Sequence, residues 1–127
     1  MMPSLNVSDL LYDTLDAEFH LPIYRQGSMS DDEDYPESFF TFWNNSTEDD
    51  SFYDGEELRT NWSFDLNFYS SDPSIVFSTL IAAKKALKKV GFIPDGNGYD
   101  TPSDEETHTG RGMELIYIDT NGGMKNG

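Results

Sequence analysis

The sequence of 127 residues contains no cysteine, which excludes disulfide bonds and thiolate metal sites. Basic residues are scarce, because eight Lys and Arg stand against 24 Asp and Glu, and the formal net charge is −16. A surface with this charge repels nucleic acid phosphate and anionic lipid, and it also repels other copies of the chain. An assembly of identical copies therefore needs local charge complementarity.

Long apolar segments are also missing. No run approaches the roughly 20 apolar residues of a membrane span, and residues 1–11 do not combine a basic region with an apolar stretch, so we expect no signal peptide. The sequence has no nucleophile elbow, phosphate-binding loop or dinucleotide fingerprint. These features favour a protein that stays in the cytoplasm until it is assembled, is not an enzyme and has no cofactor.

Aromatic residues, in contrast, are plentiful: nine Phe, seven Tyr and two Trp make up 14% of the chain. Each buries a large apolar area, and acidic disordered chains are usually poor in them. The sequence therefore predicts one folded domain over residues 1–120, followed by a flexible tail over residues 121–127. Acidic residues gather with Gly, Pro or Ser in three segments that we expect to be exposed loops, at residues 28–37, 45–58 and 95–110.

The spacing of apolar residues predicts the ordered elements. Residues 4–18 have helical periodicity, with Ser4 or Asn6 as the capping residue. Residues 60–69 alternate as a strand with one buried face requires, and the apolar side is formed by Trp62, Phe64, Leu66 and Phe68. Further strands are expected at residues 23–26, 39–44, 92–94 and 113–119.

The clearest helix signal begins at Asp72. This residue is a suitable N-cap, Pro73 is a suitable first helical residue, and Gly91 fits the position just beyond the helix end. Between them runs an apolar stripe that consists of Val76, Leu80, Ala83, Leu87 and Val90.

The resulting order of elements is α-β-β-β-α-β-β. Strands 39–44 and 60–69 are expected to pair as a hairpin with a long acidic tip. Because turns rather than helices join neighbouring strands, the order predicts an α+β fold in which two helices pack on one face of a mostly antiparallel sheet.

Half of the basic residues lie in the second helix, as Lys84, Lys85, Lys88 and Lys89. One interpretation is a solvated helix end, where the helix dipole favours cations. The alternative is a basic patch that meets an acidic loop of a neighbouring copy, since the lysines form two adjacent rows at i, i+4 spacing.

A second candidate interaction site is the aromatic segment that includes Tyr35, Phe39 and Trp43. Aromatic side chains are over-represented among the residues that dominate interface energies. Packing in the core is the alternative for this segment, above all for Phe40 and Phe42.

Metal binding has weak support. His20 and His108 lie in separate segments without a second ligand at metal spacing. Residues 95–106 place Asp95, Asn97 and Glu106 at positions one, three and twelve of a calcium loop, but Asp100 stands where the turn needs glycine. An ordinary acidic loop is the favoured interpretation.

We also interpret four glycines as turn residues: Gly96, Gly98, Gly110 and Gly112.

Several strings carry a resemblance to a known family. They are PIYRQGS at 22–28, YP at 35–36, SFFTFWN at 38–44, WSFDLNFYS at 62–70, the segment 83–94, YD at 99–100, SDE at 103–105 and HTGRG at 108–112. Together, over residues 21–118, they resemble the small tail-terminator or tail-completion proteins of long-tailed bacteriophages of Gram-positive hosts. The expected α+β layout is also similar to the tail-terminator fold.

The resemblance implies a structural role in virion assembly. Such a subunit caps the growing tail tube and offers a docking face to the head connector or stopper protein. It assembles with itself into a ring, by family analogy a hexamer, through which DNA passes without specific binding, and free subunits can be monomeric. The resemblance implies no cofactor and no catalytic residue, and it places the protein in the host cytoplasm during assembly and then in the virion tail.

Two alternatives stay open. The chain fits a different neck protein, such as a head-completion subunit, or a tail-assembly chaperone, because all of these are small binding modules. It also fits an inhibitor that mimics DNA with its carboxylates, given the net charge of −16.

Overall fold

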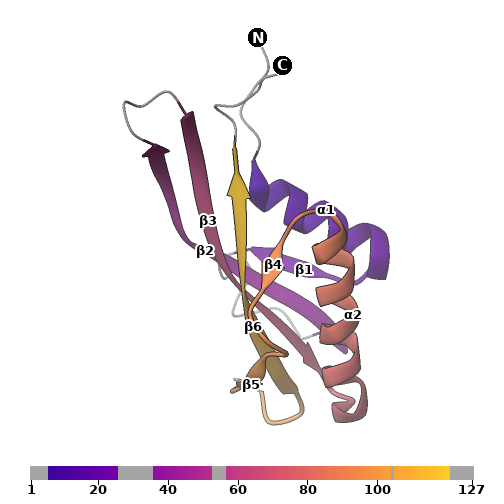
Figure 1. The fold of residues 1–127 in the computed structure, drawn as a ribbon. Helices are drawn as coiled ribbons and strands as arrows, with labels where there is room; N and C mark the ends of the chain where they lie inside the picture. Colours follow the sequence, from indigo (N-terminus) through magenta and orange to yellow (C-terminus); the bar gives the residue numbers. More distant parts are fainter. Residues whose placement is uncertain (1–5, 26–35, 53–56, 104, 121–127) are drawn as a thin grey trace.

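The computed structural model describes residues 6–25, 36–52, 57–103 and 105–120. Two helices pack side by side on one face of a single twisted sheet (Figure 1). The elements in chain order are α1 (Val7–Phe19), β1 (Ile23–Arg25), β2 (Ser38–Phe52), β3 (Glu57–Ser70), the short 3₁₀ helix η1 (Pro73–Ile75), α2 (Val76–Lys89), β4 (Ile93–Pro94), β5 (Tyr99–Thr101) and β6 (Thr109–Asp119). The predicted α+β fold with a mostly antiparallel sheet is confirmed.

The described residues form a sheet of six strands, with β1-β2-β3-β6-β4 as its path and β5 also paired to β6. The β2–β3 and β3–β6 pairs are long and antiparallel, whereas the short β1 pairs with β2 in parallel. Strands β4 and β5 follow one another along the outer edge of β6. The centre of the sheet is therefore β3, the strand whose alternation is clearest in the sequence.

Helix α1 starts as its sequence requires. The Asn6 side chain accepts hydrogen bonds from the backbone N–H groups of Ser8 (3.0 Å) and Asp9 (3.3 Å), so Asn6 rather than Ser4 caps the helix. Its buried face consists of Val7, Leu11 and Leu15. The helix ends at His20, whose φ of 55° is left-handed.

Helix α2 is preceded by η1, which begins at the predicted proline. Asp72 accepts bonds from the backbone N–H (3.0 Å) and hydroxyl (2.7 Å) of Ser74, and these bonds lower the pKa of the Asp72 carboxyl. At the other end, Gly91 has a φ of 109°. There the N–H of Gly91 bonds to the carbonyl of Lys88, and the N–H of Phe92 bonds to that of Leu87. This pattern is a Schellman motif, which glycine permits.

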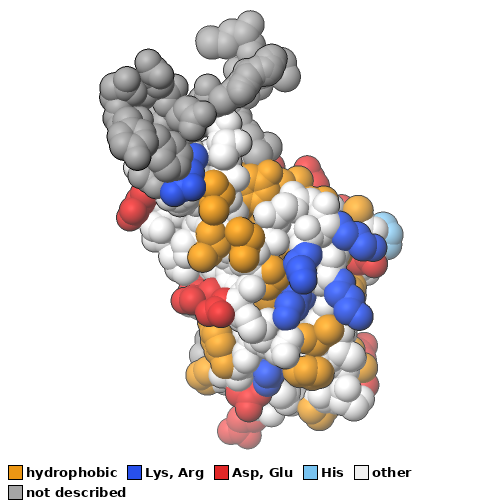
Figure 2. Space-filling model, viewed as in Figure 1, with side chains coloured by type: hydrophobic (Ala, Val, Ile, Leu, Met, Phe, Trp, Pro, Cys, Tyr) orange, Lys and Arg blue, Asp and Glu red, His pale blue; other side chains and the backbone are white. Residues whose placement is uncertain are grey.

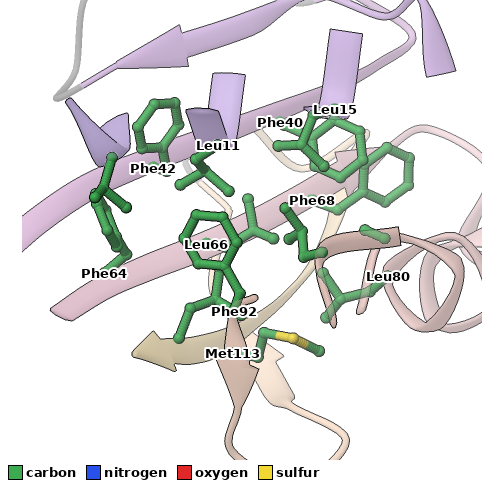
Figure 3. Close-up of a cluster of buried hydrophobic side chains, with 14 of the residues drawn as sticks. Leu11, Leu15, Phe40, Phe42, Phe64, Leu66, Phe68, Leu80, Phe92 and Met113 are labelled. Carbon is green, nitrogen blue, oxygen red and sulfur yellow. The ribbon is translucent and has the colours of Figure 1, made fainter. Parts of the chain in front are cut away.

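The core lies between the helices and the sheet (Figure 3). Phenylalanine rings meet there: the centroids of Phe40 on β2 and Phe68 on β3 are 4.8 Å apart, and those of Phe64 on β3 and Phe92, which precedes β4, are 6.1 Å apart. Aliphatic side chains from the two helices complete the cluster, notably Leu11, Leu15, Leu80 and Leu87. Each fully buried side chain of this kind contributes roughly 1.5–3 kcal/mol.

The prediction of an acidic loop at residues 45–58 is wrong for most of its length. Strand β2 continues through Glu48, Asp49 and Asp50 to Phe52, and β3 begins at Glu57. Pairing with β3 holds these residues extended, after a register shift between Asn44 and Ser46. Polar contacts such as Thr60 Oγ1 to Asp49 Oδ1 (2.9 Å) join the two strands. Acidic residues on such an edge oppose pairing with further strands.

The expected loop at residues 95–110 also contains sheet structure, because it includes β5 and the start of β6. The fold therefore has one strand more than predicted. Gly110 and Gly112 lie within β6, where Tyr69 and Asn67 on β3 occupy the space of a Cβ atom. They are strand glycines, whereas Gly96 and Gly98 lie at the turn between β4 and β5 with positive φ. Most of the expected acidic loop at residues 28–37, namely residues 28–35, and the whole of the expected tail at residues 121–127 lie outside the described residues.

Candidate functional site

The lysines of α2 divide into two groups. The half-buried Lys84 donates to the Gly96 carbonyl (2.7 Å) and to Asn97 Oδ1 (2.8 Å), so it fastens α2 to the β4–β5 turn. Lys85, Lys88 and Lys89 are exposed, and none of them forms an ion pair with a described residue. We call these three residues the lysine face; basic side chains gather over α2 in Figure 2.

The expected aromatic interaction site is also divided by the fold. Tyr35 lies outside the described residues. Phe39 is only 2% exposed, because Tyr69 stacks on it with a centroid distance of 5.2 Å and Tyr24 and His108 flank it. A partner would meet those neighbours rather than Phe39 itself. Trp43 is 42% exposed and remains available for a contact.

Trp43 belongs to the face of the sheet that neither helix covers. Strand alternation places the buried Phe42, Leu66 and Leu115 toward the helices, so the residues between them point the other way. Among the residues whose exposure the structure describes, seven large hydrophobic side chains are exposed, and five of them lie on this second face: Trp43, Ile93, Tyr99, Ile116 and Ile118. We call these five residues the open-face patch.

Part of this second face is closed by the chain itself. His108 forms a hydrogen bond of 2.7 Å to the Pro36 carbonyl, and Thr101 Oγ1 donates to Asn67 Oδ1 at 3.3 Å. Asn67 is accordingly buried. Most of the open-face patch lies beyond this closed part, with Ile93, Ile116 and Ile118 on β4 and β6 and Trp43 on β2. Tyr99 lies beside the closed part, because it pairs with Gly112, the partner of Asn67.

Carboxylates accompany the open-face patch. Asp65 on β3 and Glu114 on β6 are direct cross-strand partners, and one oxygen of Asp65, Oδ1, is buried without a hydrogen-bond partner among the described residues. Burial raises the pKa of the neighbouring Tyr99 above its ordinary value of 10.0, and the negative charges of Asp65, Glu114 and Asp95 raise it further. The patch therefore has a negative potential.

A shallow groove of about 390 Å³ separates the outer surfaces of the two helices. Asp13, Thr14, Ala17 and Glu18 line it from α1, and Ala86, Lys89 and Val90 line it from α2 and its end. Because Lys89 borders this groove opposite two carboxylates, the helix surface is acidic on the α1 side and basic on the α2 side.

The remaining charged and histidine side chains do not form a further site among the described residues, because they have structural partners or lie far from one another. Arg111 bonds to Asp100 (2.9 Å) and to the carbonyls of Asn97 and Gly98, and its guanidinium lies over the Phe77 ring. His20 ends α1, far along the chain from His108. The described part of the chain contains no group of three His, Asp or Glu side chains that could hold a metal ion; Asp104, within the suggested calcium loop, is not among the described residues.

Sequence reasoning placed the strand 113–119 but missed the patch on it. The side of β6 that bears Met113 and Leu115 is buried, and the isoleucines at 116 and 118 make the opposite side apolar as well. Two apolar sides on one strand, with helices for only one of them, are the signal that points to a second contact surface.

Neither helix of the described structure is long and apolar enough to cross a membrane. No protein-family model matches the sequence, and no curated protein matches it.

Proposed function

We propose that this protein is a structural subunit of virion assembly, a tail terminator or tail-completion subunit that caps a phage tail tube and provides the surface for head joining. Beyond the likeness of the sequence strings, one observation supports the proposal: the molecule has two chemically different exposed surfaces on opposite sides of its sheet. The lysine face lies on the helix side, and the open-face patch lies on the other side.

Two unlike surfaces suit an assembly of repeated copies. When one surface of a subunit binds the other surface of the next, the contact is heterologous, and a rotation that closes generates a ring. The proposed ring, by family analogy a hexamer, surrounds a channel for DNA. Carboxylates that face such a channel repel phosphate, so DNA passes without specific binding.

The proposed partners are other copies of the chain, the tail tube protein and the head connector or stopper protein. In this role the protein is in the host cytoplasm during assembly and then in the virion tail. It needs no catalytic residue and no cofactor, because its work is to bind and to position other proteins.

Deletion of the gene from the phage that encodes it tests the proposal. Electron microscopy is then expected to show full heads beside unjoined or over-long tails. Joined virions of normal tail length would refute a terminator or joining role. Protein detected in purified mature particles separates a terminator, which is retained, from a tail-assembly chaperone, which is not.

One feature of the fold supports a second candidate function, which is inhibition of a DNA-binding enzyme by DNA mimicry. Glu48, Asp49 and Asp50 lie consecutively in β2 rather than in a loop, so the backbone that bears these three acids is extended and paired. Competition with DNA for a nuclease distinguishes the two functions: a DNA mimic reduces cleavage, and a tail subunit leaves it unchanged.

A further inference from the structure

The open-face patch combines exposed apolar area with unbalanced charge. Ile93 and Ile116 are direct cross-strand partners and are 52% and 43% exposed. Beside them, Asp65 and Glu114 are paired across β3 and β6. Carboxylates in such positions have Cβ atoms about 4.5–5.5 Å apart, and their mutual repulsion destabilises the isolated sheet. A cationic partner would remove this repulsion, so the patch suits a surface that is both apolar and basic.

The lysine face has the matching geometry. Lys85 precedes Lys88 by three residues and Lys89 by four, which places neighbouring side chains on a helix about 5–6 Å apart. This spacing is close to that of the carboxylates Asp65 and Glu114. Lysine stems are themselves apolar and pack well on hydrophobic side chains while their charged ends reach carboxylates.

Other cations of the chain are less suitable. Arg25 is paired with Asp9 at 2.8 Å, Arg111 is paired with Asp100, and Lys84 bonds to the β4–β5 turn. The lysine face is thus the basic surface that the described fold leaves available. In a protein with a net charge of −16, random contacts between copies are repulsive, and an interface that pairs this face with carboxylates is selected electrostatically.

We infer that the lysine face of one copy docks on the open-face patch of the next, with Lys85, Lys88 and Lys89 against Asp65 and Glu114 and with the isoleucines beneath the lysine stems. The inference rests on the proposed function for its assumption that copies assemble. It adds to that function the two surfaces that meet and the charge pairs that set their register.

A charge exchange tests the contact on the purified full chain. The variants are Lys85→Glu, Glu114→Lys and the double variant Lys85→Glu/Glu114→Lys, which restores opposite charges between positions 85 and 114 of neighbouring copies. Sedimentation velocity, at protein concentrations up to about 1 mM and at low salt, measures association. Each single variant is expected to raise the apparent Kd about tenfold, and the double variant to recover most of that loss.

A matched control separates a specific contact from a change of net charge. Glu106→Lys makes the same change of charge as Glu114→Lys at an exposed position outside both surfaces. It lowers general repulsion between copies and is expected to leave the apparent Kd unchanged or slightly lower. Circular dichroism and thermal melts check that every variant is folded.

Three results would overturn the inference: a wild-type chain that stays monomeric over the whole concentration range, association that both single variants leave unchanged, or a double variant no better than its parents. These outcomes are independent of the phage phenotype. Association that follows the charge exchange, together with normal virions after gene deletion, keeps the contact and rejects the terminator role. If association ignores the charge exchange but deletion of the gene leaves heads and tails unjoined, the contact is rejected and the terminator role is kept.

Discussion

Asp65 on β3 and Glu114 on β6 stand directly opposite each other in the centre of the sheet, on the face that neither helix covers. Like charges in this arrangement weaken a sheet, and Asp65 Oδ1 has no hydrogen-bond partner among the described residues. Binding of a cationic partner would relieve the repulsion between these two carboxylates, so the pair favours the bound subunit over the isolated one.

Neutralising one member of the pair should stabilise the free subunit. Glu114→Gln removes the repulsion and keeps the shape of the side chain, so we expect the free energy of unfolding to rise by less than about 1 kcal/mol, given the solvent around Glu114. Urea denaturation of dilute protein measures the change. Glu105→Gln, at an exposed turn position, is the control and should have no effect; a loss of stability in Glu114→Gln would contradict the prediction.

The pKa of Tyr99 depends on the charges of Asp65 and Glu114. Burial and the carboxylates Asp65, Glu114 and Asp95 raise the folded-state pKa of Tyr99 above 10.0. Its contribution to stability is therefore complete below pH 10.0 and is lost as the pH rises through the folded-state pKa. Ultraviolet titration should show that Tyr99 ionises late, as a high-pH component of the curve that Tyr99→Phe removes. Glu114→Gln should lower that pKa, and an unchanged titration curve would count against the proposed proximity.

The close packing of β6 on β3 requires a glycine at residue 112. A Cβ atom at Gly112 would overlap Asn67 Oδ1, and Asn67 is buried. Gly112→Ala should therefore destabilise the fold by about 1–3 kcal/mol. A double-mutant cycle with Asn67→Ala checks the cause, because the alanine at 112 should cost less when the amide is absent. Additive effects would show that the overlap is not responsible.

Leu115 and Ile116 are neighbours in β6 that point to opposite faces, so they should respond differently to truncation. Leu115 is fully buried in the core, and Leu115→Ala should reduce the free energy of unfolding by about 2–5 kcal/mol. Ile116 is 43% exposed, and Ile116→Thr keeps its β-branched shape, so it should change stability by less than about 1 kcal/mol. Ile116→Thr should instead weaken self-association, measured by sedimentation. Equal destabilisation by both variants would contradict the assignment of faces.

The sequence predicted those elements whose stability is local or strictly periodic. The alternation in β3 and the capping residues Asn6 and Gly91 were sufficient for the main strand, the start of α1 and the end of α2. The predicted start of the second helix was displaced, because Asp72 caps η1 and α2 itself begins at Val76 without a side-chain cap. The acidic extension of β2 was missed because its side chains have low strand propensity, and its extended form depends on pairing with β3. Strand β5 was missed for a similar reason, since its three residues form a strand by pairing with β6, which follows later in the chain.

The candidate site was predicted in part. The spacing of the lysines identified them as a group. It did not separate Lys84 from the other three, because Lys84 donates hydrogen bonds to Gly96 and Asn97, which lie in a turn that folds back on α2. Trp43 was named and is exposed, whereas Phe39 is enclosed by aromatic rings from other strands. Contacts that join distant segments carry no signature in a single sequence.

The most direct test of the central claim is a count of joined virions after deletion of the gene and complementation in trans. The account predicts unjoined heads and aberrant tails without the gene, and joined virions when the wild-type chain or Lys85→Glu/Glu114→Lys is supplied, but not when either single variant is supplied. Joined virions of normal tail length in the absence of the gene would contradict the account.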